Sequence, residues 1–71
     1  MDRFAESEEH YLIAIQQSPD DAETRFLLAR VLAAQGNLDR AIEQLAKALQ
    51  VNPGMQKAII MRGELEARRQ P

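Results

Sequence analysis

His10, the only histidine in the chain, comes closest to a catalytic or metal-binding pattern. Glu6 lies one helical turn before it and Glu9 is its neighbour. In a helix, Glu6 and His10 share one face, and together they offer two ligands for a divalent metal. A stable site needs a third ligand and usually a fourth, and no other residue is placed for this by its spacing. We therefore predict a solvated His10 and no metal site.

Other catalytic patterns are missing as well. The sequence has no cysteine, no Ser/His/Asp set and no glycine-rich loop of the kind that binds phosphates. It also has no pair of acids set in a cavity that would shift their pKa values, and a short helical chain has little room for a deep pocket. We expect no catalytic residues, no cofactor and no enzyme activity.

Charge is distributed unevenly along the chain. Residues 1–23 hold seven acids and one base, a net −6, whereas residues 24–71 hold four acids and eight bases, a net +4; the sum is the overall −2. Such runs usually mark solvated helix faces, although opposite signs at the two ends favour head-to-tail association. The net charge is negative, and no aromatics alternate with Arg62, Arg68 and Arg69. We therefore predict no binding to nucleic acid.

Length and composition indicate one small domain over residues 1–71. No stretch approaches the roughly 20 apolar residues of a membrane span, and the N-terminus lacks the basic-then-apolar layout of a signal peptide. We therefore expect a cytoplasmic protein that does not associate with membranes. Apolar residues make up 45% of the chain but aromatics only 4%, and there is no cysteine. Stability must therefore come from closely packed helices, either within one chain alone or together with self-association.

Proline and glycine divide the chain into four segments. Apolar residues recur with a helical period within them, and no alternating strand pattern is present. Asp20 or Asp21 is placed to cap the second segment, and Asp20 with Glu23 fits an acidic capping box. Gly36 suits a left-handed helix end, and the short junction after it forces an antiparallel hairpin. We predict helices over residues 2–17, 21–35, 38–51 and 55–69.

An internal repeat is the strongest pattern in the sequence. Thirty-four residues separate Pro19 from Pro53, and the segments before these prolines, 11–19 and 45–53, align without a gap. Self-similarity at a spacing of this length is typical of repeat proteins, in which one helical hairpin recurs and packs on its neighbours. A scaffold for another protein is therefore favoured over a catalyst.

The repeat resembles the tetratricopeptide repeat family. Residues 22–53 are similar to one complete repeat, with half repeats before and after it. At residue 7 a serine stands where alanine is usual, and Arg62 and Glu66 stand where leucine and an aromatic residue are expected. The matching positions are Leu28, Ala29, Leu32, Gly36, Ala41, Leu45, Ala48, Leu49 and Pro53.

The resemblance implies an all-α fold of antiparallel helical hairpins, a four-helix fragment of a right-handed α–α superhelix. It also implies a concave groove that binds a peptide or a partner protein. Phe26, Arg30 and Ala33 share a face directed away from the leucine core, which we interpret as part of this groove; the alternative is that Phe26 packs on the fourth helix. The predicted partner-binding residues are Phe26, Arg30, Ala33, Lys57, Ile60, Met61 and Glu64.

The fourth helix supports a second interpretation. Residues 58–61 are four consecutive apolar residues, which surround a helix instead of forming one face. They pack either within the monomer or in an interface. The alternative function is therefore self-assembly, in which the same apolar surface and the fourth helix form a homodimer.

Overall fold

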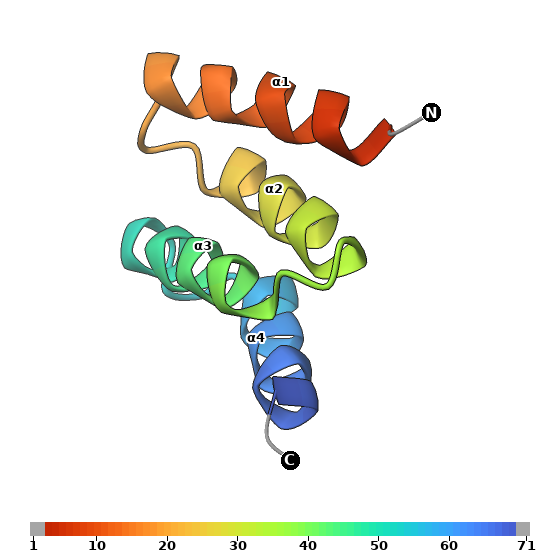
Figure 1. The fold of residues 1–71 in the computed structure, drawn as a ribbon. Helices are drawn as coiled ribbons and strands as arrows, with labels where there is room; N and C mark the ends of the chain where they lie inside the picture. The colour runs from red at the N-terminus through yellow and green to blue at the C-terminus, as the bar shows by residue number, and fades with distance from the viewer. Residues whose placement is uncertain (1–2, 70–71) are drawn as a thin grey trace.

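The computed structural model of the protein describes residues 3–69 and shows four helices in succession (Figure 1). They are α1 (Arg3–Gln17), α2 (Ala22–Ala34), α3 (Leu38–Val51) and α4 (Gln56–Arg69). The predicted all-α fold is confirmed, and residues 21, 35 and 55 lie just outside the helices. The predicted start at residue 2 lies outside the described residues. Each helix packs on the next along the chain, so α1 and α4 lie at opposite ends of the stack (Figure 1).

The turn between α2 and α3 is fixed by a glycine in the left-handed region. Gly36 has φ +84°, which costs glycine little and other residues more. Its N–H donates to the Ala33 carbonyl at 3.0 Å, and the Asn37 N–H donates to the Leu32 carbonyl at 2.8 Å. This pair of bonds is a Schellman motif, as expected where a helix ends at glycine. The following helix begins directly after Asn37, which makes no side-chain cap hydrogen bond.

The loops after α1 and α3 have the same hydrogen bonds, displaced by 34 residues. The N–H of Ser18 donates to the Ala14 carbonyl at 2.9 Å, and the N–H of Asn52 donates to that of Ala48 at 2.9 Å. In the first loop the Asp21 N–H donates to the Ser18 carbonyl at 3.1 Å, and in the second the Met55 N–H donates to the Asn52 carbonyl at 3.1 Å. The sequence repeat is therefore also a structural repeat, in which α1 and α2 correspond to α3 and α4.

Asp21 is the residue that caps α2. Its carboxylate accepts a hydrogen bond from the Thr24 N–H at 3.1 Å and another from the Thr24 hydroxyl at 2.6 Å. The first of these satisfies a backbone donor that has no partner inside the helix. The predicted capping box between Asp20 and Glu23 was wrong, because the N-cap is Asp21, whose carboxylate bonds Thr24, and the Glu23 carboxylate pairs with Lys57.

The core lies mainly between α2 and α3. Leu28, Leu32 and Leu45 are fully buried, and burying each stabilises the fold by roughly 2 kcal/mol. Buried alanines among the larger side chains allow the helices to approach closely. Those that are completely buried are Ala29, Ala41, Ala48 and Ala58.

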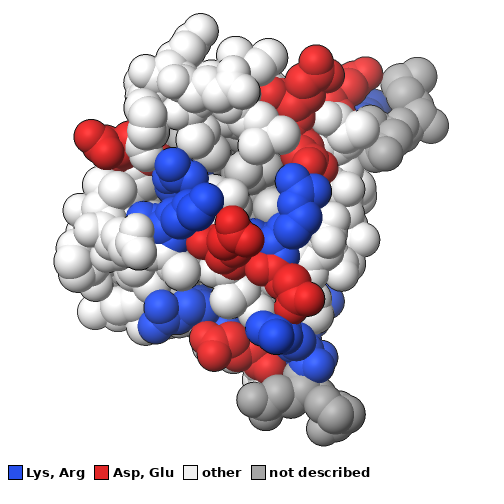
Figure 2. Space-filling model, turned by 60° about the vertical axis from the view of Figure 1, so that its left-hand side comes forward, with Lys and Arg blue, Asp and Glu red and all other residues white. Residues whose placement is uncertain are grey.

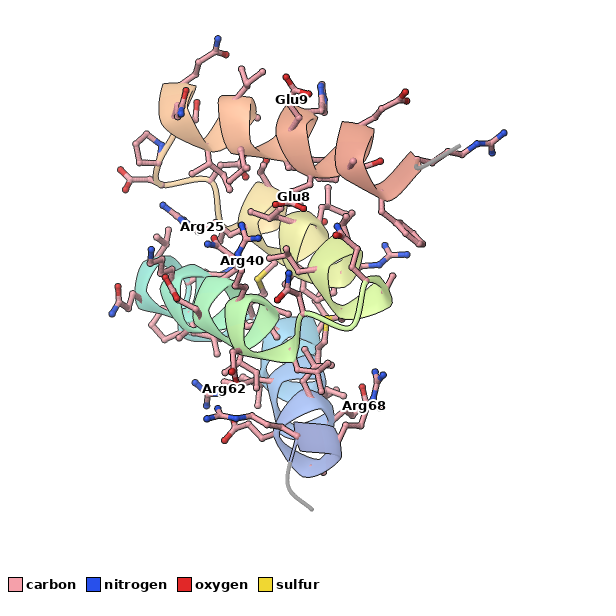
Figure 3. The ribbon with its side chains drawn as sticks, viewed as in Figure 1. Glu8, Glu9, Arg25, Arg40, Arg62 and Arg68 are labelled. Carbon is pink, nitrogen blue, oxygen red and sulfur yellow. The ribbon has the colours of Figure 1, made fainter. Side chains whose placement is uncertain are left out.

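Charged side chains connect the helices on the side that faces the viewer in Figure 2, where basic and acidic groups alternate. Glu8 of α1 forms an ion pair with Arg40 of α3 at 3.1 Å and accepts a hydrogen bond from Gln35 at 3.0 Å. Arg25 of α2 donates to Gln44 of α3 at 3.0 Å. Figure 3 shows Glu8, Arg25 and Arg40 between α1 and α3, with Glu9 on the opposite side of α1. These contacts position α1 against the α2–α3 hairpin.

Candidate functional site

The candidate site is the surface shared by α2 and α4, the two helices that carry the residues predicted to line a groove. Phe26 and Ala33 of α2 are only 9% and 8% exposed, so these two residues do not form an open face, and their role in partner binding stays a prediction. Phe26 belongs to the core. The alternative interpretation, packing of Phe26 on the fourth helix, is what the structure shows.

Lys57 is the residue of α4 that covers Phe26. Its ammonium nitrogen lies 4.8 Å from the centre of the Phe26 ring, within range of a cation–π interaction. The same nitrogen lies 2.6 Å from a carboxylate oxygen of Glu23. Lys57 therefore connects α4 to α2 through two contacts, and its side chain is half exposed.

The other four predicted residues differ in exposure. Ile60 is 59% exposed, the highest value among the large hydrophobic residues described, and Arg30 and Glu64 are also exposed. Met61 is partly buried against the core. Within residues 3–69, neither Arg30 nor Glu64 has an ion-pair partner. The α2–α4 surface therefore presents one apolar side chain and two unpaired charges of opposite sign.

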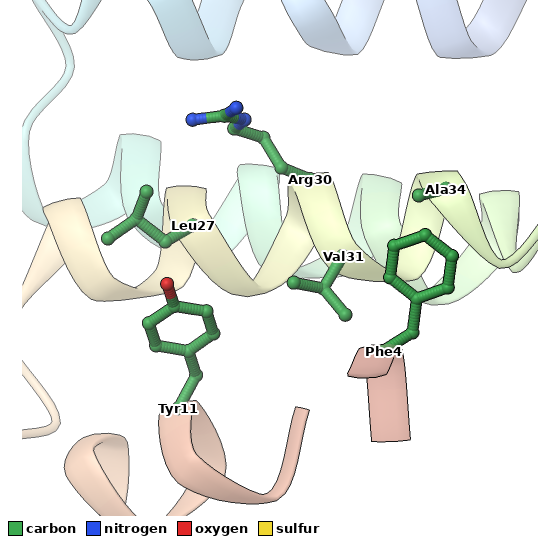
Figure 4. Close-up of a pocket in the computed structure, with 6 residues that line it drawn as sticks. All are labelled: Phe4, Tyr11, Leu27, Arg30, Val31 and Ala34. Carbon is green, nitrogen blue, oxygen red and sulfur yellow. The ribbon is translucent and has the colours of Figure 1, made fainter. Parts of the chain in front are cut away.

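A groove that the sequence analysis missed lies between α1 and α2 (Figure 4). It has a volume of about 250 Å³. Figure 4 shows the Tyr11 and Phe4 rings of α1 directed toward α2, with Arg30 extending away from them. The α2 side of the groove is formed by Leu27, Arg30, Val31 and Ala34. The 34-residue spacing could have revealed this groove, because it marks the faces of α1 and α2 that correspond to the buried faces of α3 and α4.

The side chains that could bind a metal or take part in catalysis are not gathered into one site. His10 packs edge-on against Tyr11, with 5.6 Å between ring centres. In the described part of the chain, no group of three or more His, Cys, Asp or Glu residues is arranged to hold a metal. The pKa of the Asp21 carboxyl is lowered by the hydrogen bond from the Thr24 hydroxyl and then by that from the Thr24 N–H. These contacts belong to the helix cap, so this pKa shift reflects structure and not catalysis.

None of the helices described between residues 3 and 69 has the length and apolar character needed to cross a membrane.

Comparison with known families decides the classification. The family model described as Tetratricopeptide repeat matches residues 1–69. The chain belongs to the tetratricopeptide repeat family. This family is a non-catalytic interaction module, and its repeats generally mediate protein–protein interactions. A search of curated proteins gave no match.

Proposed function

We propose that this tetratricopeptide repeat protein binds a peptide or a partner helix across the α2–α4 surface and has no catalytic activity of its own. The observation that carries this proposal is the 59% exposure of Ile60, one helical turn from exposed Glu64 on α4, together with exposed Arg30 on α2. In a family whose repeats generally mediate protein–protein interactions, an exposed large apolar side chain flanked by charges supports an interaction role for this surface. Lys57 and Met61 lie at its edge, while Phe26 and Ala33 support it from below.

The surface favours a partner with an apolar residue and charges on both sides of it. Ile60 would contact the apolar side chain, Arg30 an acidic group and Glu64 a basic group. An amphipathic helix presents these groups at intervals of three or four residues. Because the charges are exposed, we expect them to contribute more to orientation and association rate than to affinity.

The test is selection of binders from a displayed library of helical peptides on the immobilised protein. We expect selected peptides to bind the wild-type protein and to lose binding to Ile60→Asp, because the variant replaces the apolar contact by a charge. Ile13→Asp is the matched control, since Ile13 is 48% exposed on α1. Peptides that bind Ile60→Asp as well as wild type would contradict the proposal.

A further inference from the structure

Because the structure repeats, the same kind of groove occurs at two places in the molecule. The groove between α1 and α2 is open, whereas the equivalent surface of α3 and α4 is filled. The α1–α2 groove corresponds, 34 residues earlier, to the surface formed by α3 and α4, since the connecting loops share the same hydrogen bonds. In the second case α2 fills the surface: it packs along α3 and contacts α4 through the Lys57 pair. The molecule itself therefore shows which kind of helix fits such a groove.

The exposure of equivalent residues shows that the first groove lacks its helix. Leu45 is 0% exposed, whereas its counterpart Tyr11 is only partly buried. Leu65 is 2% exposed, whereas its counterpart Val31 is partly buried. Phe4, at the end of the groove, is 46% exposed. These apolar walls are those that a helix equivalent to α2 would cover.

By the 34-residue spacing, the helix equivalent to α2 is α4. The face of α4 that corresponds to the face of α2 packed on α3 is exposed. Arg62 and Glu66 correspond to buried Leu28 and Leu32, and their side chains are 40% and 52% exposed. Ile59 corresponds to Arg25, which donates to Gln44 of α3, and is 40% exposed. We propose that the groove between α1 and α2 binds α4 of a second copy of this chain, so that copies associate head to tail. This contact goes beyond the proposed partner binding, because it uses the groove and the Ile59 face in place of the Ile60 surface.

The departures from the repeat pattern coincide on the two sides of this contact. Within one chain, Leu28 and Leu32 share the core with Ala41 and Leu45. In the proposed contact between two chains, Arg62 and Glu66 of α4 take the places of Leu28 and Leu32. On α1, Ser7 and Tyr11 take the places of Ala41 and Leu45. Polar groups thus replace apolar ones on both sides together, so neither surface places a polar group against a purely apolar partner.

Charge is complementary as well. Helix α1 contains one base and three acids, a net −2, whereas α4 contains four bases and two acids, a net +2. Opposite charges on the two surfaces steer such an encounter and disfavour α1–α1 and α4–α4 pairing. Added salt should therefore weaken the association.

The geometry of the contact predicts growth beyond a dimer. Each copy has one groove and one exposed α4 face, at opposite ends of the stack (Figure 1). A contact between two different surfaces leaves one of each unused, so association continues unless a ring closes. A symmetric pairing through α4 alone would stop at two chains.

Sedimentation equilibrium of the full chain, from micromolar to near-millimolar concentration, tests the proposal. We expect the average mass of the wild-type protein to rise from 8.0 kDa to more than twice that value. Phe4→Asp blocks the groove and Ile59→Asp blocks the helix face, so each variant alone should remain at the monomer mass. An equimolar mixture retains one intact groove and one intact α4 face, and should form a 1:1 dimer that grows no further.

The controls are Leu12→Asp and Ile13→Asp, which place the same charge on exposed positions of α1 outside the groove. Both should associate as wild type does. Ala34→Arg provides a second groove variant at an exposed position, and circular dichroism verifies that each variant is folded. A wild-type chain that stays monomeric overturns the proposal. So does a mixture that does not form dimers, or a dimer that is lost only in Ile59→Asp.

Discussion

At the scale of single residues, the contact between Lys57 and Phe26 explains how α4 is held to α2. The cation covers the ring face and also pairs with Glu23. Half of the lysine side chain remains exposed, so the ion pair contributes little by itself. The main stabilisation comes from burial of the aromatic ring, which makes Phe26 a structural residue of the α2–α4 surface.

Substitution of Phe26 by alanine should therefore destabilise the fold. Removing a buried phenylalanine side chain costs about 3–5 kcal/mol, and each kcal/mol lowers the Tm of a small domain by roughly 4–8 °C. We expect a fall in Tm of more than about 10 °C by circular dichroism. Leu12→Ala, at a 36% exposed position, is the control. A Tm close to that of wild type would show that Phe26 is not part of the core.

The Asp21 cap predicts how stability changes in acid. Its pKa in the folded chain lies below the ordinary 3.8, because the Thr24 hydroxyl and N–H donate to the carboxylate. The cap therefore stabilises the fold fully above pH 3.8 and is lost as pH falls through the lowered pKa. In Asp21→Asn the side chain still accepts a hydrogen bond but does not titrate.

Thermal melts between pH 2 and pH 7 measure this effect. We expect the Tm of Asp21→Asn to fall less on acidification than that of wild type, and Asp20→Asn to behave as wild type does. Equal acid slopes for all three proteins would contradict the role of Asp21.

At the scale of helices, α1 and α4 differ from the α2–α3 hairpin in how completely they are covered. No residue of α1 is buried, whereas six residues of α2 are. Helix α1 is positioned partly by polar contacts, in particular those of Glu8 with Arg40 and Gln35. The surfaces proposed for contact with other chains therefore lie on the two outer helices and on the sides of α2 next to them.

The proposed pairing of α4 with α1 can be strengthened by design. The triple variant Ser7→Ala, Arg62→Leu and Glu66→Leu copies the residue types of Ala41, Leu28 and Leu32 onto the contact. We expect at least about tenfold tighter self-association, equivalent to about 1.4 kcal/mol, in sedimentation equilibrium. Adding Phe4→Asp should reverse the gain. Association that persists with Phe4→Asp would indicate non-specific contact instead.

At the scale of the whole molecule, the fold could be predicted from the sequence because the helix ends are marked by local residues and the repeat has a fixed spacing. Gly36 and the two prolines set the helix ends, and the 34-residue spacing set the order of packing. Burial was harder to predict. Phe26 and Ile60 occupy equivalent positions 34 residues apart, yet Phe26 is covered by Lys57 and Ile60 is exposed. The α1–α2 groove was missed because it depends on contacts between separate helices and not on one helical face.

The most direct test of the central claim, that the α2–α4 surface binds a partner, is chemical-shift mapping by NMR. A peptide obtained by the selection described above is titrated into ¹⁵N-labelled protein under dilute conditions. We predict that the largest shifts occur at Arg30, Lys57, Ile60 and Glu64, with small shifts at Leu12 and Ile13. Shifts confined to α1, or to the groove formed by Phe4, Tyr11 and Val31, would contradict the claim.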